Sequence, residues 1–90
     1  YGIKMMKSFN LNIITPEKTV YEGRVVSLMV PAALGYLGVL VNHAPLAANL
    51  HKGKISIKKE SGEKLTLNLE EKGFIEVLKN KVTLIISGGI

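Results

Sequence analysis

The side chains that most often carry out catalysis are few in this sequence and are poorly spaced for it. The only histidines, His43 and His51, lie eight residues apart, which is neither the i, i+4 spacing of a helical pair nor the i, i+2 spacing of a strand pair. The chain has no aspartate and no cysteine, which excludes a Ser-His-Asp triad and a cysteine-based metal site. We therefore expect no catalytic residue, no metal site and no cofactor, and a structural role for His51.

Two other segments contain residues that are common in functional sites, one acidic and one rich in glycine, but neither matches a complete motif. Glu70, Glu71 and Glu76 are the only acidic group that resembles a catalytic carboxylate pair, but they lie in or beside a polar turn with Lys72. We expect these carboxylates to be solvated. Residues 35–38, Gly-Tyr-Leu-Gly, lack the Gly-Lys-Ser/Thr ending of a phosphate-binding loop. The sequence thus favours a binding module over an enzyme.

Length and composition predict one small globular domain. The chain has 90 residues, of which 47% are apolar and 21% charged, and ninety residues are near the lower end of what buries an independent core. The net charge of +5 raises the question of nucleic-acid binding. Eleven of the twelve basic residues are lysines, with no arginine cluster, which is typical of a solvated surface. An OB-like module that binds single-stranded nucleic acid is kept as the alternative function.

Alternation of apolar and polar residues dominates the sequence and predicts strands. Phe9, Leu11 and Ile13 alternate with Asn10 and Asn12, the pattern of a half-buried strand. Similar short segments predict further strands at 19–21, 54–58, 65–69, 74–78 and 82–86. Because these strands are short and no segment has helical periodicity, the sequence indicates an all-β sandwich or barrel.

Turn residues set the expected ends of these strands. Glu22-Gly23 is expected to stop the short strand at 19–21. Residues 60–63, Glu-Ser-Gly-Glu, predict a tight hairpin turn, because glycine supplies the positive φ that such turns need. Residues 79–81, Lys-Asn-Lys, are expected to join the last two strands.

The middle of the chain has a different pattern. All nineteen charged residues, twelve basic and seven acidic, lie outside Val25–Leu50. Apolar residues here occupy both faces of the expected strand, with Val25 and Met29 on one face and Val26, Leu28 and Val30 on the other. A strand that is covered on one side only should instead alternate with polar residues.

Three arrangements would explain this uncharged segment. Residues 25–41 are of borderline length for a membrane span and are interrupted by Ser27, Pro31, Gly35 and Gly38. Strands buried on both faces are hard to arrange within ninety residues. We favour the third explanation, in which one face belongs to the core and the other is covered by a partner protein.

A set of short segments occurs in a specific order along residues 6–86. They are Ile14-Thr15-Pro16, Val20-Tyr21-Glu22-Gly23, Val30-Pro31, Gly38-Val39-Leu40-Val41-Asn42-His43-Ala44-Pro45-Leu46, Gly73-Phe74-Ile75-Glu76-Val77 and Val82-Thr83-Leu84. This ordered set, centred on His-Ala-Pro-Leu, resembles the N-terminal β-sandwich domain of the epsilon subunit of rotary F-type ATP synthases, which is called delta in mitochondria.

The resemblance implies a fold and a function. The expected fold is all-β, a flattened ten-stranded β-sandwich over residues 6–90, with residues 1–5 as an N-terminal extension that is either foreign to the domain or disordered. The expected function is that of a non-catalytic central-stalk (rotor) subunit. It would dock on the gamma subunit and the c-ring and so couple transmembrane proton flow to ATP synthesis. The expected location is peripheral, on the cytoplasmic face of the bacterial plasma membrane.

The resemblance also assigns candidate sites residue by residue. The positions that match the family's gamma-binding surface are Thr15, Pro16, His43, Ala44, Pro45, Leu46 and Ala48. The positions that match its c-ring contact are Ala33, Leu34, Gly35 and Tyr36.

Four positions depart from the family's usual pattern. Tyr36 stands where the family usually has an acidic residue, and it offers a hydroxyl and an aromatic face without a charge. Val41-Asn42 replaces Pro-Gly, and Lys72 replaces the first glycine of Gly-Gly-Phe.

Typical epsilon subunits continue into a C-terminal helical hairpin that restrains ATP hydrolysis and in some members binds ATP. This sequence ends at Ile90. We therefore expect no C-terminal helical hairpin, no inhibition of the hairpin type and no nucleotide binding in this chain.

Overall fold

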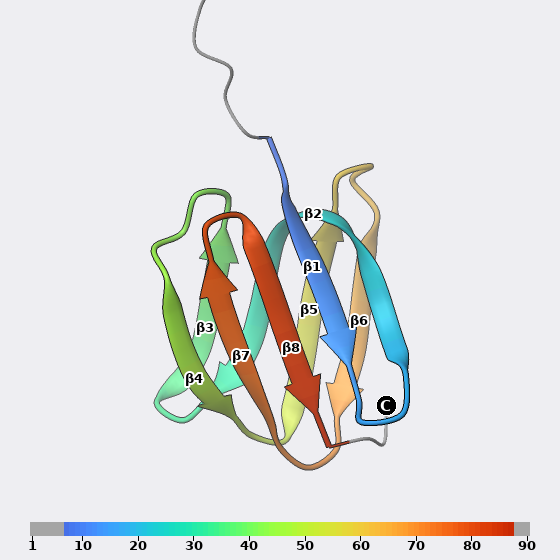
Figure 1. Ribbon diagram of the computed structural model, residues 1–90, viewed down its shortest axis with the longest axis vertical. Coiled ribbons are helices and arrows are strands. Elements are labelled where there is room, and N and C mark those ends of the chain that lie inside the picture. Colours follow the sequence, from blue (N-terminus) through green and yellow to red (C-terminus); the bar gives the residue numbers. More distant parts are fainter. Residues whose placement is uncertain (1–6, 88–90) are drawn as a thin grey trace, which may run out of the picture.

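The computed structural model describes residues 7–87, which form strands and no helix (Figure 1). The strands are β1 (Phe9–Ile14), β2 (Thr19–Ala32), β3 (Gly35–Leu40), β4 (Leu46–Leu50), β5 (Gly53–Lys59), β6 (Lys64–Leu69), β7 (Gly73–Leu78) and β8 (Lys81–Ile86). The all-β prediction is confirmed, with eight strands in the described part rather than the ten that the resemblance implies. The expected domain boundary at residue 6 lies outside the described residues.

The strands form two packed layers that share β2. The front layer has the order β4-β7-β8-β1-β2, and the back layer has the order β3-β2-β5-β6 (Figure 1). The N-terminal part of β2 pairs antiparallel with β1, and its C-terminal part pairs with β3 and β5. A single fourteen-residue strand therefore passes from one layer to the other.

This length of β2 corrects one expectation. The sequence predicts that Glu22-Gly23 ends a short strand, but Glu22 pairs with Asn12 and Gly23 with Leu11 in the ladder to β1. The pairing with β1 satisfies the backbone of this segment on one side, which outweighs the turn preference of glycine.

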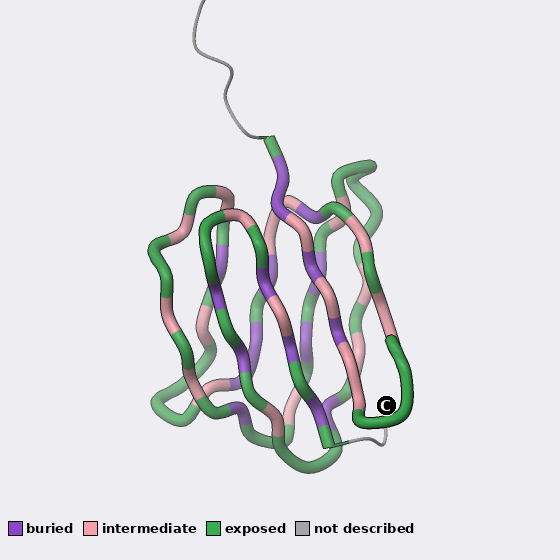
Figure 2. Tube along the Cα trace, viewed as in Figure 1, coloured by how far each residue is buried: buried purple, intermediate pink, exposed green. Residues whose placement is uncertain are grey.

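The core lies between the two layers and follows the predicted alternation. Phe9, Leu11 and Ile13 of β1 are buried, and so are Ile55 and Ile57 of β5 (Figure 2). The remaining buried apolar residues are Val25, Leu28, Val30, Val39, Leu50, Leu69, Ile75, Val77, Val82, Leu84 and Ile86. Every strand therefore contributes to one continuous core.

A β-bulge at Val26 explains much of the two-sided apolar pattern. Val25 pairs with Lys59 of β5 and Ser27 pairs with Lys58, so Val26 is an extra residue on β2. An extra residue moves the following side chains to the opposite face. Leu28 is consequently buried, whereas Met29 is 44% exposed. The prediction that Val25 and Met29 share a face is wrong for this reason. Residues 25–40 lie in β2, β3 and the turn between them, and the described part of the chain contains no helix that could span a membrane.

The predicted turns at 60–63 and 79–81 are confirmed. Gly62 has φ 95° at the β5–β6 turn, and Asn80 has φ 53° at the β7–β8 turn. Strand β8 then lies parallel to β1, with Leu11 opposite Val82 and Ile13 opposite Leu84. The first and last strands of the chain are thus neighbours in the front layer (Figure 1).

Candidate functional site

The loop between β3 and β4, which carries His43, is fixed by a pair of asparagines. The backbone N–H of Asn42 donates to Asn80 Oδ1 at 2.8 Å, and Asn80 Nδ2 donates to Asn42 Oδ1 at 2.7 Å. Asn42 has φ 64°, in the left-handed region that asparagine tolerates better than most other residues with a side chain. Asn42 therefore supplies the positive φ at the position where the resemblance implies a glycine.

His43 is half-buried in the middle of this loop, and its ring orientation is set locally. Its backbone N–H donates to Leu40 O at 3.2 Å, and its ring Nδ1 lies 2.7 Å from Ala44 O. A carbonyl oxygen only accepts hydrogen bonds, so Nδ1 is the donor in this contact. Ala44 and Pro45 beside it are exposed. The loop thus belongs to the surface and is not sealed in the core.

Strand β4, which follows this loop, is an edge strand of the front layer. It pairs with β7 on one side, while on the other side only Leu50 has a strand partner, Ala32. Leu46 and Ala48 are half-buried and pack against the core. β4 therefore presents apolar surface next to an open backbone edge.

The predicted c-ring residues form the exposed tip of the β2–β3 hairpin. Leu34 is fully exposed, at 104% of its reference area, and Tyr36 is 56% exposed. Ala33 and Gly35 are exposed as well, and Gly35 has φ 127°, which favours glycine. The Tyr36 hydroxyl accepts a hydrogen bond from the backbone N–H of Lys54 at 3.3 Å. The tip thus offers an uncharged apolar and aromatic surface.

A hollow of about 450 Å³ joins this tip to β4. Residues 32–37 line one side of it, and residues 46–49 line the other. The structure therefore brings the predicted c-ring residues together with Leu46 and Ala48 of the predicted gamma-binding set. We call this surface, made of residues 32–37 and 46–49, the hairpin–β4 groove. His43, Ala44 and Pro45 precede β4 and do not line it.

Thr15 and Pro16 lie apart from the other candidates, after the end of β1. In the front layer, β7 and β8 separate β1 from β4. Thr15 Oγ1 accepts hydrogen bonds from the backbone N–H groups of Glu17 and Lys18 at 3.2 and 3.1 Å, which holds the β1–β2 loop in a local turn. The two parts of the predicted gamma-binding set thus share one layer but not one patch.

A row of apolar side chains on the outer face of the front layer lies between these two parts. Phe74 is 38% exposed and pairs with Ile85, which is 45% exposed. Ile85 is next to Ile14 of β1, and Phe74 is next to Asn49 of β4. Sequence reasoning missed this row, although apolar residues at both alternating positions of 74–78 and 84–86 signalled it.

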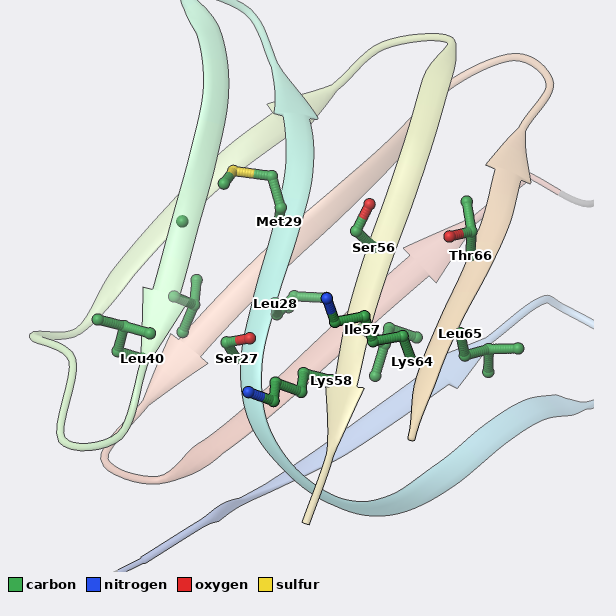
Figure 3. Close-up of a pocket in the computed structure, with 12 residues that line it drawn as sticks. Ser27, Leu28, Met29, Leu40, Ser56, Ile57, Lys58, Lys64, Leu65 and Thr66 are labelled. Atoms are coloured by element: carbon green, nitrogen blue, oxygen red, sulfur yellow. The ribbon is translucent and has the colours of Figure 1, made fainter. Parts of the chain in front are cut away.

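A second hollow, of about 630 Å³, lies on the outer face of the back layer (Figure 3). Met29, Ser56 and Thr66 form one row across three neighbouring strands, and Lys58 and Lys64 lie in the next row. None of its twelve lining residues is aromatic, so this basic surface lacks the stacking platform of a single-strand binder. The alternative function as a nucleic-acid module gains no support from it.

The residue types of catalytic and metal sites are dispersed over the surface. Glu70, Glu71 and Glu76 are exposed, as predicted. His51 is also exposed, which corrects the expectation of a structural side chain; only its backbone N–H is fixed, by Pro31 O at 2.8 Å. Within residues 7–87, no three His, Cys, Asp or Glu side chains are grouped as a metal ion requires.

Comparison with known proteins gives a consistent family assignment. Residues 8–89 match the family model of the β-sandwich domain of the ATP synthase delta/epsilon chain. The chain is 48% identical over 80 residues to the ATP synthase epsilon chain of Leptospira borgpetersenii serovar Hardjo-bovis, a match that covers 89% of this chain and 61% of the relative. It is 39% identical over 82 residues to the ATP synthase epsilon chain of Desulfosudis oleivorans, a match that covers 91% of this chain and 61% of that relative.

Solved structures show the same fold. A chain in the Euglena gracilis mitochondrial ATP synthase structure, described as OSCP/F1/c-ring, matches with a TM-score of 0.87 at 18% identity, over 97% of this chain and 55% of that one. A chain in the Tetrahymena thermophila mitochondrial ATP synthase central stalk/c-ring structure matches with a TM-score of 0.71 at 17% identity, over 96% and 67%.

The family assignment rests on nearly the whole of the described chain, although the chain spans only about three-fifths of the length of these curated relatives. It agrees with the prediction that the domain is not itself catalytic. The sandwich, the ordered segments around His43 and the sequence matches together show that this chain belongs to the family of ATP synthase delta/epsilon β-sandwich domains.

Proposed function

We propose that this chain is a central-stalk (rotor) component of an F-type ATP synthase that docks on the gamma subunit and the c-ring. In this role it couples transmembrane proton flow to ATP synthesis without catalysing a reaction itself. The names of its relatives and the titles of the similar structures support this proposal. Through the complex it is peripheral to the membrane, on the cytoplasmic face of the bacterial plasma membrane.

One observation carries the proposal for gamma docking. The His43 loop, β4 and the β2–β3 tip follow one another around one side of the sandwich, and no residue from Val25 to Leu50 is charged. Depletion of charge together with half-buried apolar side chains such as Leu46 is typical of the core of a protein–protein interface. The rest of the surface is rich in lysine, so this side stands out as the docking surface.

The tip of the β2–β3 hairpin fits the proposed contact with the c-ring. The β2–β3 hairpin tip lies at one end of the sandwich, and the β3–β4 loop lies at the other end (Figure 1). Leu34 and Tyr36 at the tip are exposed. Because the tip has no carboxylate, we propose that it meets the ring through apolar contact and through the aromatic face of Tyr36 rather than through an ion pair.

Capture of the gamma subunit by the purified chain at physiological salt tests the proposal. We expect His43→Asp to weaken capture by about tenfold or more, because the half-buried position would place an unpaired charge in the interface. His51→Asp is the matched control, since it introduces the same charge at the other, exposed histidine, and we expect it to stay within about twofold. Absence of capture by the unmodified chain, or equal loss in both variants, would contradict the proposal.

A further inference from the structure

The sandwich has four edge strands, and they differ in how they are protected. An edge strand exposes unpaired backbone N–H and C=O groups, which most proteins guard with charged side chains, lysine above all. On one side of this molecule, β6 begins with Lys64, and the N-terminal part of β2 carries Glu22 and Arg24. On the opposite side, β3 and β4 carry no charge at all.

The side formed by β3 and β4, whose edge strands carry no charge, is also where the core is incompletely covered. β3 pairs only with β2, and residues 46–49 of β4 have strand partners only in β7 within the described chain. Leu37, Leu46 and Ala48 pack against the core yet stay half-buried. The hairpin–β4 groove of about 450 Å³ lies between the two open strands. An occupant of this groove would complete both the backbone ladder and the apolar packing.

We infer that the hairpin–β4 groove receives an extended, uncharged segment of the partner protein, which adds a strand to the free edge of β4. An open ladder of backbone groups is satisfied by another strand and not by a helix, whose backbone groups are already paired. The inference rests on the proposed function, because it takes the gamma subunit as the partner. It also gives the uncharged segment 35–50 a physical cause, since charges here would block the added strand.

The dimensions of the groove limit the segment that fits. Residues 46–49 offer one short stretch of ladder, which at about 3.3 Å per residue matches a segment of about four or five residues. Side chains alternate along a strand, so every second residue of the segment points into the groove. These positions face Leu37, Leu46 and Ala48 and must be apolar.

Hydrogen exchange on the complex tests the added strand directly. Alternate N–H groups of β4 point away from β7, and these amides should exchange fast in the isolated chain. On binding of purified gamma subunit, we expect their exchange to slow by about tenfold or more, because each gains a hydrogen bond and loses contact with water. Amides of the opposite edge strand, β6, should exchange at an unchanged rate.

A pair of lysine variants gives an independent readout. Ala48→Lys places a guarding charge in the groove and should weaken gamma capture by about tenfold or more. Thr66→Lys places the same charge on the exposed face of β6 and should leave capture within about twofold. If Ala48→Lys markedly lowers the thermal midpoint of the chain, its loss of gamma capture could come from unfolding. In that case the hydrogen exchange of the unmodified complex is the test of the inference.

The possible outcomes separate the inference from the proposed function. Gamma capture without slowed exchange in residues 46–49 would overturn the inference and leave the proposed function in place. Absence of gamma capture would overturn both. Slowed exchange in β4 of the chain alone, rising with its concentration, would show that a second copy occupies the edge and would also overturn the inference. The inference is supported if exchange in β4 slows only when the gamma subunit is bound and if Ala48→Lys loses gamma capture.

Discussion

At the scale of single residues, two asparagines hold neighbouring loops of the sandwich together. Asn42 and Asn80 both adopt positive φ, at 64° and 53°, and each bonds the other across two loops. Asn80 O also accepts a hydrogen bond from the backbone N–H of Asn10 at 3.0 Å. Asn80 thus links the β3–β4 loop through its side chain and the start of β1 through its backbone carbonyl.

We predict that Asn80→Ala lowers the free energy of unfolding by about 1–3 kcal/mol, because it removes two hydrogen bonds and leaves alanine in the left-handed region. Asn80→Gly removes the same bonds without that strain and should cost about 1 kcal/mol less. Urea unfolding of the two variants measures the difference. Equal stability of both variants would show that the backbone at residue 80 relaxes.

At the scale of elements, the bulge in β2 decides which side chains enter the core. Val25 is buried before the bulge and Leu28 after it, so the buried positions change from odd to even residue numbers. The strand also bends from the front layer to the back layer over this region (Figure 1). Bulges increase local twist and bending, which is how one strand takes part in two layers.

This arrangement predicts opposite results for two lysine substitutions four residues apart. Val25→Lys should destabilise the domain by more than about 3 kcal/mol, because it buries an unpaired charge. Met29→Lys should change stability by no more than about 0.5 kcal/mol, since this side chain is exposed on the outer face. Chemical unfolding of both variants checks this. Similar losses would mean that Val25 and Met29 share a face, as strict alternation requires.

At the scale of the whole molecule, the fold is closed by pairing between β1 and β8, the first and last strands of the described residues. β8 lies between β7 and β1 and pairs with both, parallel to β1 and antiparallel to β7. The core residues Val82, Leu84 and Ile86 come from this one strand. The front layer therefore cannot be complete before the last strand of the chain is in place.

We predict that a chain ending at Asn80 loses cooperative thermal unfolding. Without β8, the strands β1 and β7 lose the strand that pairs with both, and the core loses three buried side chains. A chain ending at Ser87 retains all eight strands and should unfold in a single transition like the full chain. Circular dichroism during heating measures both. A cooperative transition in the shorter chain would show that β8 is dispensable for the fold.

The sequence by itself determined the fold class, most strand positions, two of the turns and the family. Period-2 alternation depends only on the neighbouring residues of one strand, so it was readable at Phe9, Leu11 and Ile13 and again at Ile55 and Ile57. The ordered segments around His43 gave the family resemblance in the same local way, and the candidate surface near β4 followed from it.

Only the tertiary structure decided how the layers meet and which edges stay open. The bulge at Val26, the passage of β2 through Gly23 and the open edges of β3 and β4 all depend on which strands become neighbours. Strand pairing joins residues far apart in sequence, and its free energy comes from those contacts rather than from local preference. For this reason, the sequence revealed an uncharged segment, whereas the structure showed that much of it lies along one open side of the sandwich.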